Sequence, residues 1–159
     1  MLITKRRSEK GQSFVELAMT LLFLLILLSA TVDLGWAFYT MITLRDAVQE
    51  AAAYGSICAF NEASDGPNTD LIEQRLLLSV TDPIDMADVE AIDVSFTDED
   101  GNEVAVPVLS GAVVVRATVL HKIVTPFVGA FIGRYDYPLT VEVADTVMRS
   151  KWLNQCDYE

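Results

Sequence analysis

The sequence predicts an α+β protein in which one long N-terminal helix packs on a small, mostly antiparallel sheet. Apolar residues fill the stretch from Gly11 to Val32 almost without interruption, whereas apolar and polar side chains alternate from Ile92 onward. A continuous apolar run of this length is typical of a helix, and alternation at a period of two is typical of strands. For 159 residues, one helix followed by one small domain is the expected organisation.

The N-terminal stretch has the length and composition of a membrane-spanning helix. No charged side chain occurs between Glu16 and Asp33, and no polar face recurs at the helical period. A bilayer core requires roughly 20 mainly apolar residues in a helix. Four basic residues precede the run and indicate a cytoplasmic N-terminus, namely Lys5, Arg6, Arg7 and Lys10. We therefore expect a single-pass membrane protein whose C-terminal domain lies outside the cytoplasm.

An uncleaved signal anchor and an ordinary signal peptide are the alternatives to this interpretation. The apolar region of a signal peptide spans only about 7–15 residues and ends at small residues that suit cleavage. Here the run is longer, and the residues from Ser29 to Asp33 form only a poor Ala-x-Ala site. Both alternatives stay open at this point, but retention of the helix is favoured.

Glu16 stands at the start of the apolar run. A carboxylate that enters the hydrocarbon costs a few kcal/mol and usually has a partner; at headgroup level, in the first helical turn, the helix dipole would favour it instead. The segment Gly11-Gln12-Ser13-Phe14-Val15-Glu16, set between a basic leader and an apolar run, resembles the type IV prepilin processing site. This resemblance implies cleavage by a membrane aspartyl peptidase between Gly11 and Gln12, which leaves Glu16 at the fifth position of the mature chain.

Further segments resemble the TadE-like family, the pilin-like minor components of tight-adherence (Tad, or Flp) pilus systems. The resemblance implies a pilin-like fold and a non-enzymatic role in pilus assembly, with the bilayer, a prepilin peptidase and other pilins as partners. It also implies that Glu16 neutralises the N-terminal amine of a neighbouring subunit. It leaves open whether the chain is of the TadE, TadF or another minor-pilin type. The segments that carry it are Val15-Glu16-Leu17, Asp33-Leu34-Gly35, Leu44-Arg45-Asp46-Ala47, Glu50 to Gly55, Val113 to Leu120, the region of Pro126, and Met148-Arg149.

We expect three parts along the chain: a basic leader (1–11), a transmembrane and stalk helix (12–58), and an extracytoplasmic α+β domain (59–159). The stalk is predicted because apolar residues recur at steps of three and four beyond the membrane run, which makes one apolar stripe. The alternative is two helices with a break near Gly35. The residues of the stripe are Leu44, Ala47, Ala51, Tyr54 and Cys58.

The outer domain should contain a short helix and about four strands. A capping box at Asp70 to Glu73 predicts a helix that ends near Val80. Alternation predicts strands that begin at Ile92, Ala112 and Leu139, and Asp100-Gly101 predicts a hairpin turn after the first of them.

The apolar segment Ile123 to Ile132 is too short to span a membrane, and its Pro and Gly would interrupt a helix. It is interpreted either as a crossover packed on the core, which is favoured, or as an exposed patch for subunit contact.

Charge and residue usage exclude several classes of function. The formal charge is −12; four basic residues and one acidic residue give the leader a net +3, so the remainder carries −15. A domain with this much negative charge is not expected to bind nucleic acid. His121 is the sole histidine, which excludes a multi-histidine metal site, and the acidic residues from Asp98 to Glu103 lack the EF-hand spacing. We expect no catalytic residues, no metal and no cofactor.

The two cysteines, Cys58 and Cys156, lie on the predicted outer side, where disulfides persist. An intramolecular bridge is expected; two free thiols or an intermolecular bond are the alternatives.

The competing function is a single-pass anchored protein whose outer domain binds a partner or ligand without entering a pilus. The mature N-terminus distinguishes the two functions.

Overall fold

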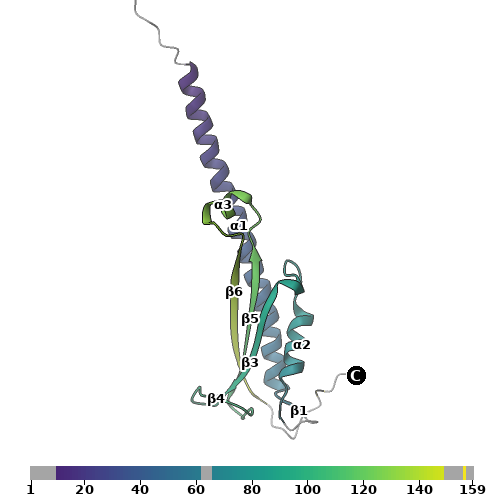
Figure 1. Cartoon of the computed structure of the whole chain (residues 1–159). Helices are drawn as coiled ribbons and strands as arrows, with labels where there is room; N and C mark the ends of the chain where they lie inside the picture. Colours follow the sequence, from purple (N-terminus) through teal and green to yellow (C-terminus); the bar gives the residue numbers. More distant parts are fainter. Residues whose placement is uncertain (1–9, 62–65, 149–155, 157–159) are drawn as a thin grey trace, which may run out of the picture. The chain divides into compact units, whose positions relative to one another are not determined.

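The computed structural model describes residues 10–61, 66–148 and 156 of the chain (Figure 1). One long helix comes first, and a small α+β domain follows it. The elements in order are α1 (Lys10–Ile57), β1 (Phe60–Asn61), β2 (Gly66–Pro67), α2 (Thr69–Ser79), the short 3-10 helix η1 (Met86–Asp88), β3 (Val89–Thr97), β4 (Glu103–Val104), β5 (Ala112–Lys122), α3 (Pro126–Ile132) and β6 (Asp136–Thr146).

The predicted fold class is confirmed. The second half of α1 packs against a four-stranded antiparallel sheet of order β4-β3-β5-β6, and β1 and β2 form a separate two-stranded ribbon. Residues on either side of Gly35 are helical, so the alternative of two helices with a break at that glycine is wrong. The basic leader lies almost wholly outside the described residues, as does the end of the closing strand at Arg149.

The chain forms two compact units. The first comprises the apolar half of α1, through Trp36, together with residues 123–135; the second comprises the rest of α1, α2 and the sheet. Because residues 123–135 belong with the apolar helix rather than with the sheet, the favoured interpretation of this segment as a crossover packed on the core is wrong. It forms α3, and its side chains at Phe127 and Phe131 are exposed.

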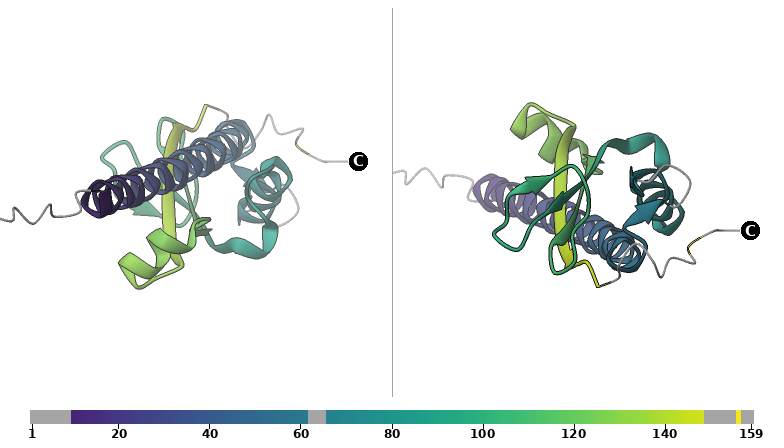
Figure 2. Two further views of the ribbon diagram at one scale, coloured as in Figure 1. Left: turned by 90° about the horizontal axis from the view of Figure 1, so that it is seen from above. Right: turned by 90° about the horizontal axis from the view of Figure 1, so that it is seen from below.

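Alternation along the strands determines which face of the sheet is buried. In β5 the side chains of Val113, Val115, Ala117 and Val119 are all at most 1% exposed. They meet an apolar stripe of α1 that includes Leu44, together with apolar residues of α2. Figure 2 shows the two helices of this unit with the strands from above and below. The outward residues pair across strands instead; Arg116 faces Glu142, and Thr118 faces Thr140.

The start of α2 differs from the expectation. The helix begins at Thr69, and Asn68 is the cap residue, but no side chain caps it. The Asn68 amide instead donates to the carbonyl of Cys58 at 3.1 Å. The predicted capping box at Asp70 is therefore wrong, because Asp70 already lies inside the first turn. The hairpin at Asp100-Gly101 is confirmed, since β4 pairs back on β3 and Gly101 adopts a φ of +84°.

Gly55 provides a test of the packing between α1, α2 and β5. A Cβ at this position would lie 3.0 Å from both Ile72 Cδ1 and Val113 Cγ2, whereas one at Gly35, in the same helix, would have no neighbour within 4 Å. We expect Gly55→Leu to lower the free energy of unfolding by about 1–3 kcal/mol through overpacking. Urea unfolding of the detergent-solubilised protein measures the change. Gly35→Leu is the matched control and should leave the unfolding midpoint of the sheet nearly unchanged; equal midpoints for the two variants would contradict the packing described.

Candidate functional site

The surface of α1 before Asp33 is apolar on every side. Its large apolar side chains are 47–73% exposed. An 18-residue stretch of the helix has a mean hydropathy of 2.3, and none of that stretch is buried. By length and composition, α1 is the one helix of the described chain that can cross a membrane; an N-terminal signal sequence has the same properties. The exposed residues in this part are Phe14, Val15, Leu17, Met19, Leu21, Leu22, Phe23, Leu24, Leu25, Ile26, Leu27, Leu28 and Val32.

The predicted processing and assembly residues share the first turns of this surface. Gly11, Gln12 and Glu16 are all exposed residues of α1. The Gln12 side-chain amide donates to Glu16 Oε1 at 3.2 Å, one helical turn away, and Thr20 donates its hydroxyl to the Glu16 carbonyl at 2.8 Å. The described part of α1 starts at Lys10, so Glu16 lies six residues after that start. Within the described residues, Glu16 thus lies on the apolar surface with a neutral amide beside its carboxylate.

The buried carboxylate of Asp33, in α1, makes contacts that were not predicted from the sequence. Asp33 is only 7% exposed, and its carboxylate accepts hydrogen bonds from the backbone amides of Val124 at 2.9 Å and Thr125 at 3.0 Å, and from the Thr125 hydroxyl. Three donors thus compensate the buried charge and hold the start of the 123–135 segment against α1. The sequence marked Asp33 as the first charge after the apolar run and as part of the Asp33-Leu34-Gly35 segment, but it gave no indication of this contact.

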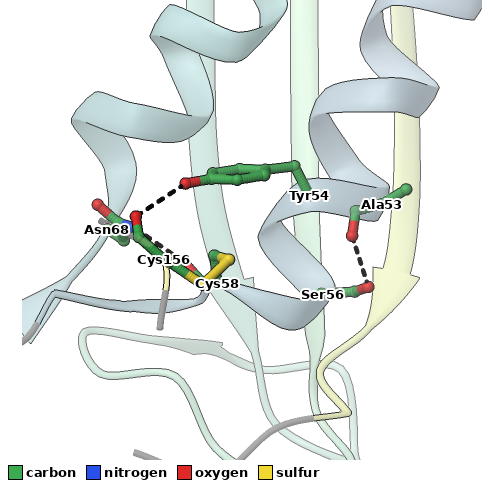
Figure 3. The surroundings of a disulfide bond; sticks show 6 residues. All are labelled: Ala53, Tyr54, Ser56, Cys58, Asn68 and Cys156. Atoms are coloured by element: carbon green, nitrogen blue, oxygen red, sulfur yellow. Dashed lines mark hydrogen bonds between the residues drawn. A yellow bond between two sulfur atoms is a disulfide. The ribbon is translucent and has the colours of Figure 1, made fainter. Parts of the chain in front are cut away.

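The outer end of α1 carries the disulfide (Figure 3). Cys58 and Cys156 are bonded, with 5.8 Å between their Cα atoms. The Tyr54 hydroxyl lies 3.5 Å from the Cys156 carbonyl, and the Asn68 amide donates to the Cys58 carbonyl. The bond therefore joins Cys156 to the place where α1 ends and α2 begins.

His121 and the acidic side chains were the remaining candidates for a catalytic or metal site. His121 is 4% exposed; its Nδ1 lies 3.1 Å from the Thr40 hydroxyl, and its ring lies 5.1 Å from that of Tyr137. Over residues 10–61, 66–148 and 156, no group of three or more histidine, cysteine or acidic side chains is placed to hold a metal ion.

The acidic hairpin loop is ordered by its own hydrogen bonds. The carboxylate of Asp98 accepts from the Asn102 side chain at 3.0 Å, the Asn102 backbone amide at 2.8 Å and the Asp100 backbone amide at 3.0 Å. These bonds, the Asn102 side chain first, hold the pKa of Asp98 below its ordinary value of 3.8. Since the folded pKa is lowered, the stabilisation is present at neutral pH and is lost as the pH falls through the folded value.

A long helix whose second half packs against a four-stranded antiparallel sheet makes this a pilin-like α+β protein. Residues 11–53 match the family described as TadE-like protein, so the chain carries a TadE-like domain over that range. The predicted resemblance is confirmed there. Its part beyond residue 53, in β5, near Pro126 and at Met148, is not covered by the match and stays a prediction. No curated protein matches the chain, and no solved structure does.

Proposed function

We propose that the chain is a non-enzymatic, membrane-anchored pseudopilin, or minor pilin, that acts in the assembly of a Tad-type pilus. The observation that carries the proposal is the TadE-like match, which begins at Gly11 and covers the apolar helix and the first part of its continuation toward the sheet. The same stretch has an all-round apolar surface with one carboxylate near its start, at Glu16.

The first step in this function is removal of the leader. A prepilin peptidase cuts between Gly11 and Gln12, so the four basic residues are lost and the apolar helix is kept. Gly11 has no side chain, and a Cβ built there would meet nothing within 4 Å, so the bond that follows it lies in an uncrowded part of the chain. The mature chain then starts with the α-amine of Gln12, a positive charge four residues before Glu16.

The second step is lateral association of mature helices. A carboxylate in an apolar bundle is unfavourable unless a positive charge compensates it. Glu16 is exposed, and in the part of the chain that the structure describes its carboxylate accepts a hydrogen bond from the Gln12 amide, so it is available to the α-amine of a neighbouring subunit. This pairing satisfies both charges and sets the axial register of the two helices. Prepilin peptidase, other pilins and the lipid bilayer are thus the partners of this protein.

The orientation follows from charge and from the disulfide. The basic leader stays in the cytoplasm, and the α+β domain, residues 59–159, lies outside it. The Cys58–Cys156 bond suits the oxidising side of the membrane.

The mature N-terminus tests the proposal. Mass spectrometry of the membrane-extracted protein should find Gln12 as the first residue in cells that contain the peptidase, and residue 1 as the first in cells that lack it. An intact leader in both strains would instead support a signal-anchored protein whose outer domain binds a partner. A mature chain that starts near Ala30 would show a cleaved signal peptide and would exclude the pilin function.

A further inference from the structure

The segment that follows β5 is built from apolar residues that the fold leaves uncovered. It folds back at residues 123 and 135, where the Ile123 amide donates to the Tyr135 carbonyl at 2.9 Å, and α3 occupies its middle. Phe131 is 93% exposed, the most of any large apolar side chain in the described part of the chain, and Phe127 and Ile132 are more than half exposed. This arrangement is unfavourable in water.

The segment belongs to the same compact unit as the apolar half of α1 (Figure 1). Asp33 fixes its start through the amides of Val124 and Thr125. At its far end, Tyr135 packs on Gly129 so closely that a Cβ there would lie 2.4 Å from the ring. The segment is therefore a fixed loop against α1 and not an extended connection.

The position of this loop along α1 indicates its surroundings. A groove of about 380 Å³ lies between α3 and α1, and all of its lining residues are apolar: Ile26, Ala30, Phe127, Val128, Phe131 and Ile132. Ile26 precedes Asp33 by seven residues, which is about 10 Å along a helix that rises 1.5 Å per residue. With the polar boundary of the membrane at Asp33, the groove reaches about 10 Å below that boundary, which is the depth to which interfacial helices bury their apolar face.

The charge of residues 123–135 also suits contact with a lipid bilayer. In a chain with a formal charge of −12, residues 123–135 contain no acidic side chain, and Arg134 is their one charged residue. Arg134 and Tyr135 are both exposed and follow α3 after the single residue Gly133. Basic and aromatic side chains in this place are typical of the lipid headgroup layer.

From these observations we propose that α3 is a second membrane contact, an interfacial helix that inserts beside α1 into the outer leaflet, with lipid acyl chains in its groove. The inference rests on the proposed membrane anchoring by α1 but not on pilus assembly. Asp33 is the positioning residue that holds α3 at this depth. The continuity of the exposed face of α3 with the membrane-spanning surface of α1 identifies lipid as the occupant.

The depth of α3 is measured by spin labelling of the full chain in phosphatidylcholine vesicles. Nitroxides are attached to Phe131→Cys, to Leu22→Cys as the membrane reference, and to Leu109→Cys, an exposed apolar position of the sheet domain, as the aqueous reference. The ratio of collision rates with oxygen and with a water-soluble nickel chelate should be several-fold higher at residue 131 than at residue 109, and close to that at residue 22. Adding Asp33→Ala should lower the ratio at residue 131 toward the aqueous value, whereas Asp46→Ala, an exposed acid of the same helix, should not.

Each other outcome has a distinct meaning. An aqueous ratio at residue 131 with a lipid ratio at residue 22 overturns the inference and leaves the proposed function intact. Spin–spin broadening at residue 131 that disappears on dilution with unlabelled protein would show a second copy in the groove and would also overturn it. An aqueous ratio at residue 22 removes the membrane anchor, and with it both proposals. An unchanged ratio in Asp33→Ala would refute the positioning role of Asp33.

Discussion

Replacing Glu16 by leucine is expected to abolish pilus formation while the protein still enters the membrane. The carboxylate lies on an apolar helix surface, and among residues 10–61, 66–148 and 156 it accepts a side-chain hydrogen bond from the neutral Gln12 amide. In the assembled bundle its removal leaves the α-amine of the neighbouring chain buried without a counter-charge, which costs roughly 3–5 kcal/mol per contact. A loss of that size lowers the affinity between subunits at least roughly 100-fold.

Membrane insertion should not suffer, because leucine favours the hydrocarbon and a carboxylate opposes it. The measurement compares the membrane fraction with sheared surface filaments, both probed for this protein. Glu16→Gln keeps the shape and removes the charge, so it should fail as Glu16→Leu does. Glu16→Asp keeps the charge and should restore part of the assembly. Filaments at the normal level from Glu16→Gln would show that charge neutralisation is not the role of this residue.

Removing the disulfide is expected to produce the largest loss of stability in the outer domain. Cys58 and Cys156 are separated by 98 residues, and a bond that closes a loop of this size stabilises by about 4–5 kcal/mol in the chain-entropy model. The double variant Cys58→Ser/Cys156→Ser should therefore unfold at a much lower urea concentration than the parent protein. Far-ultraviolet circular dichroism of the detergent-solubilised protein follows the transition.

Reduction supplies the matched control for this prediction. A reducing agent should lower the midpoint of the parent protein to that of the double variant and should leave the double variant unchanged. Peptide mapping without reductant should recover Cys58 and Cys156 as one linked pair. Two free thiols in that map, or equal midpoints for the oxidised parent and the double variant, would contradict the stabilising bridge.

Periodicity was sufficient to predict the architecture because the burial pattern is simple. The alternation in β5 is repeated by its partner β6, and together they bury one face on a helix whose apolar residues recur at steps of three and four. The apolar run of α1 is similarly plain, since no charge interrupts it before Asp33. Local composition therefore determines each of these elements, and the predicted long helix and antiparallel sheet are confirmed, although β3 and β6 each begin three residues earlier than predicted, at Val89 and Asp136.

The two errors concern contacts that the local sequence pattern does not reveal. Asp70 has the pattern of a cap, but Asn68 takes that place and donates to Cys58. The segment with Phe127 and Phe131 is as apolar as a core segment, and composition alone cannot distinguish a protein core from a lipid surface as its environment. Its location depends on Asp33, which lies 91 residues before Val124. No local pattern identifies such a contact.

The order of the sheet has a consequence for how copies of this protein meet. β6 is the last strand in the order β4-β3-β5-β6, so the backbone groups along its outer side pair with no strand in the part of the chain that the structure describes. Such an edge could recruit a strand from another molecule, but β6 includes Pro138, Glu142 and Asp145, residues that oppose strand addition. Addition of a strand from another copy along β6 is therefore disfavoured.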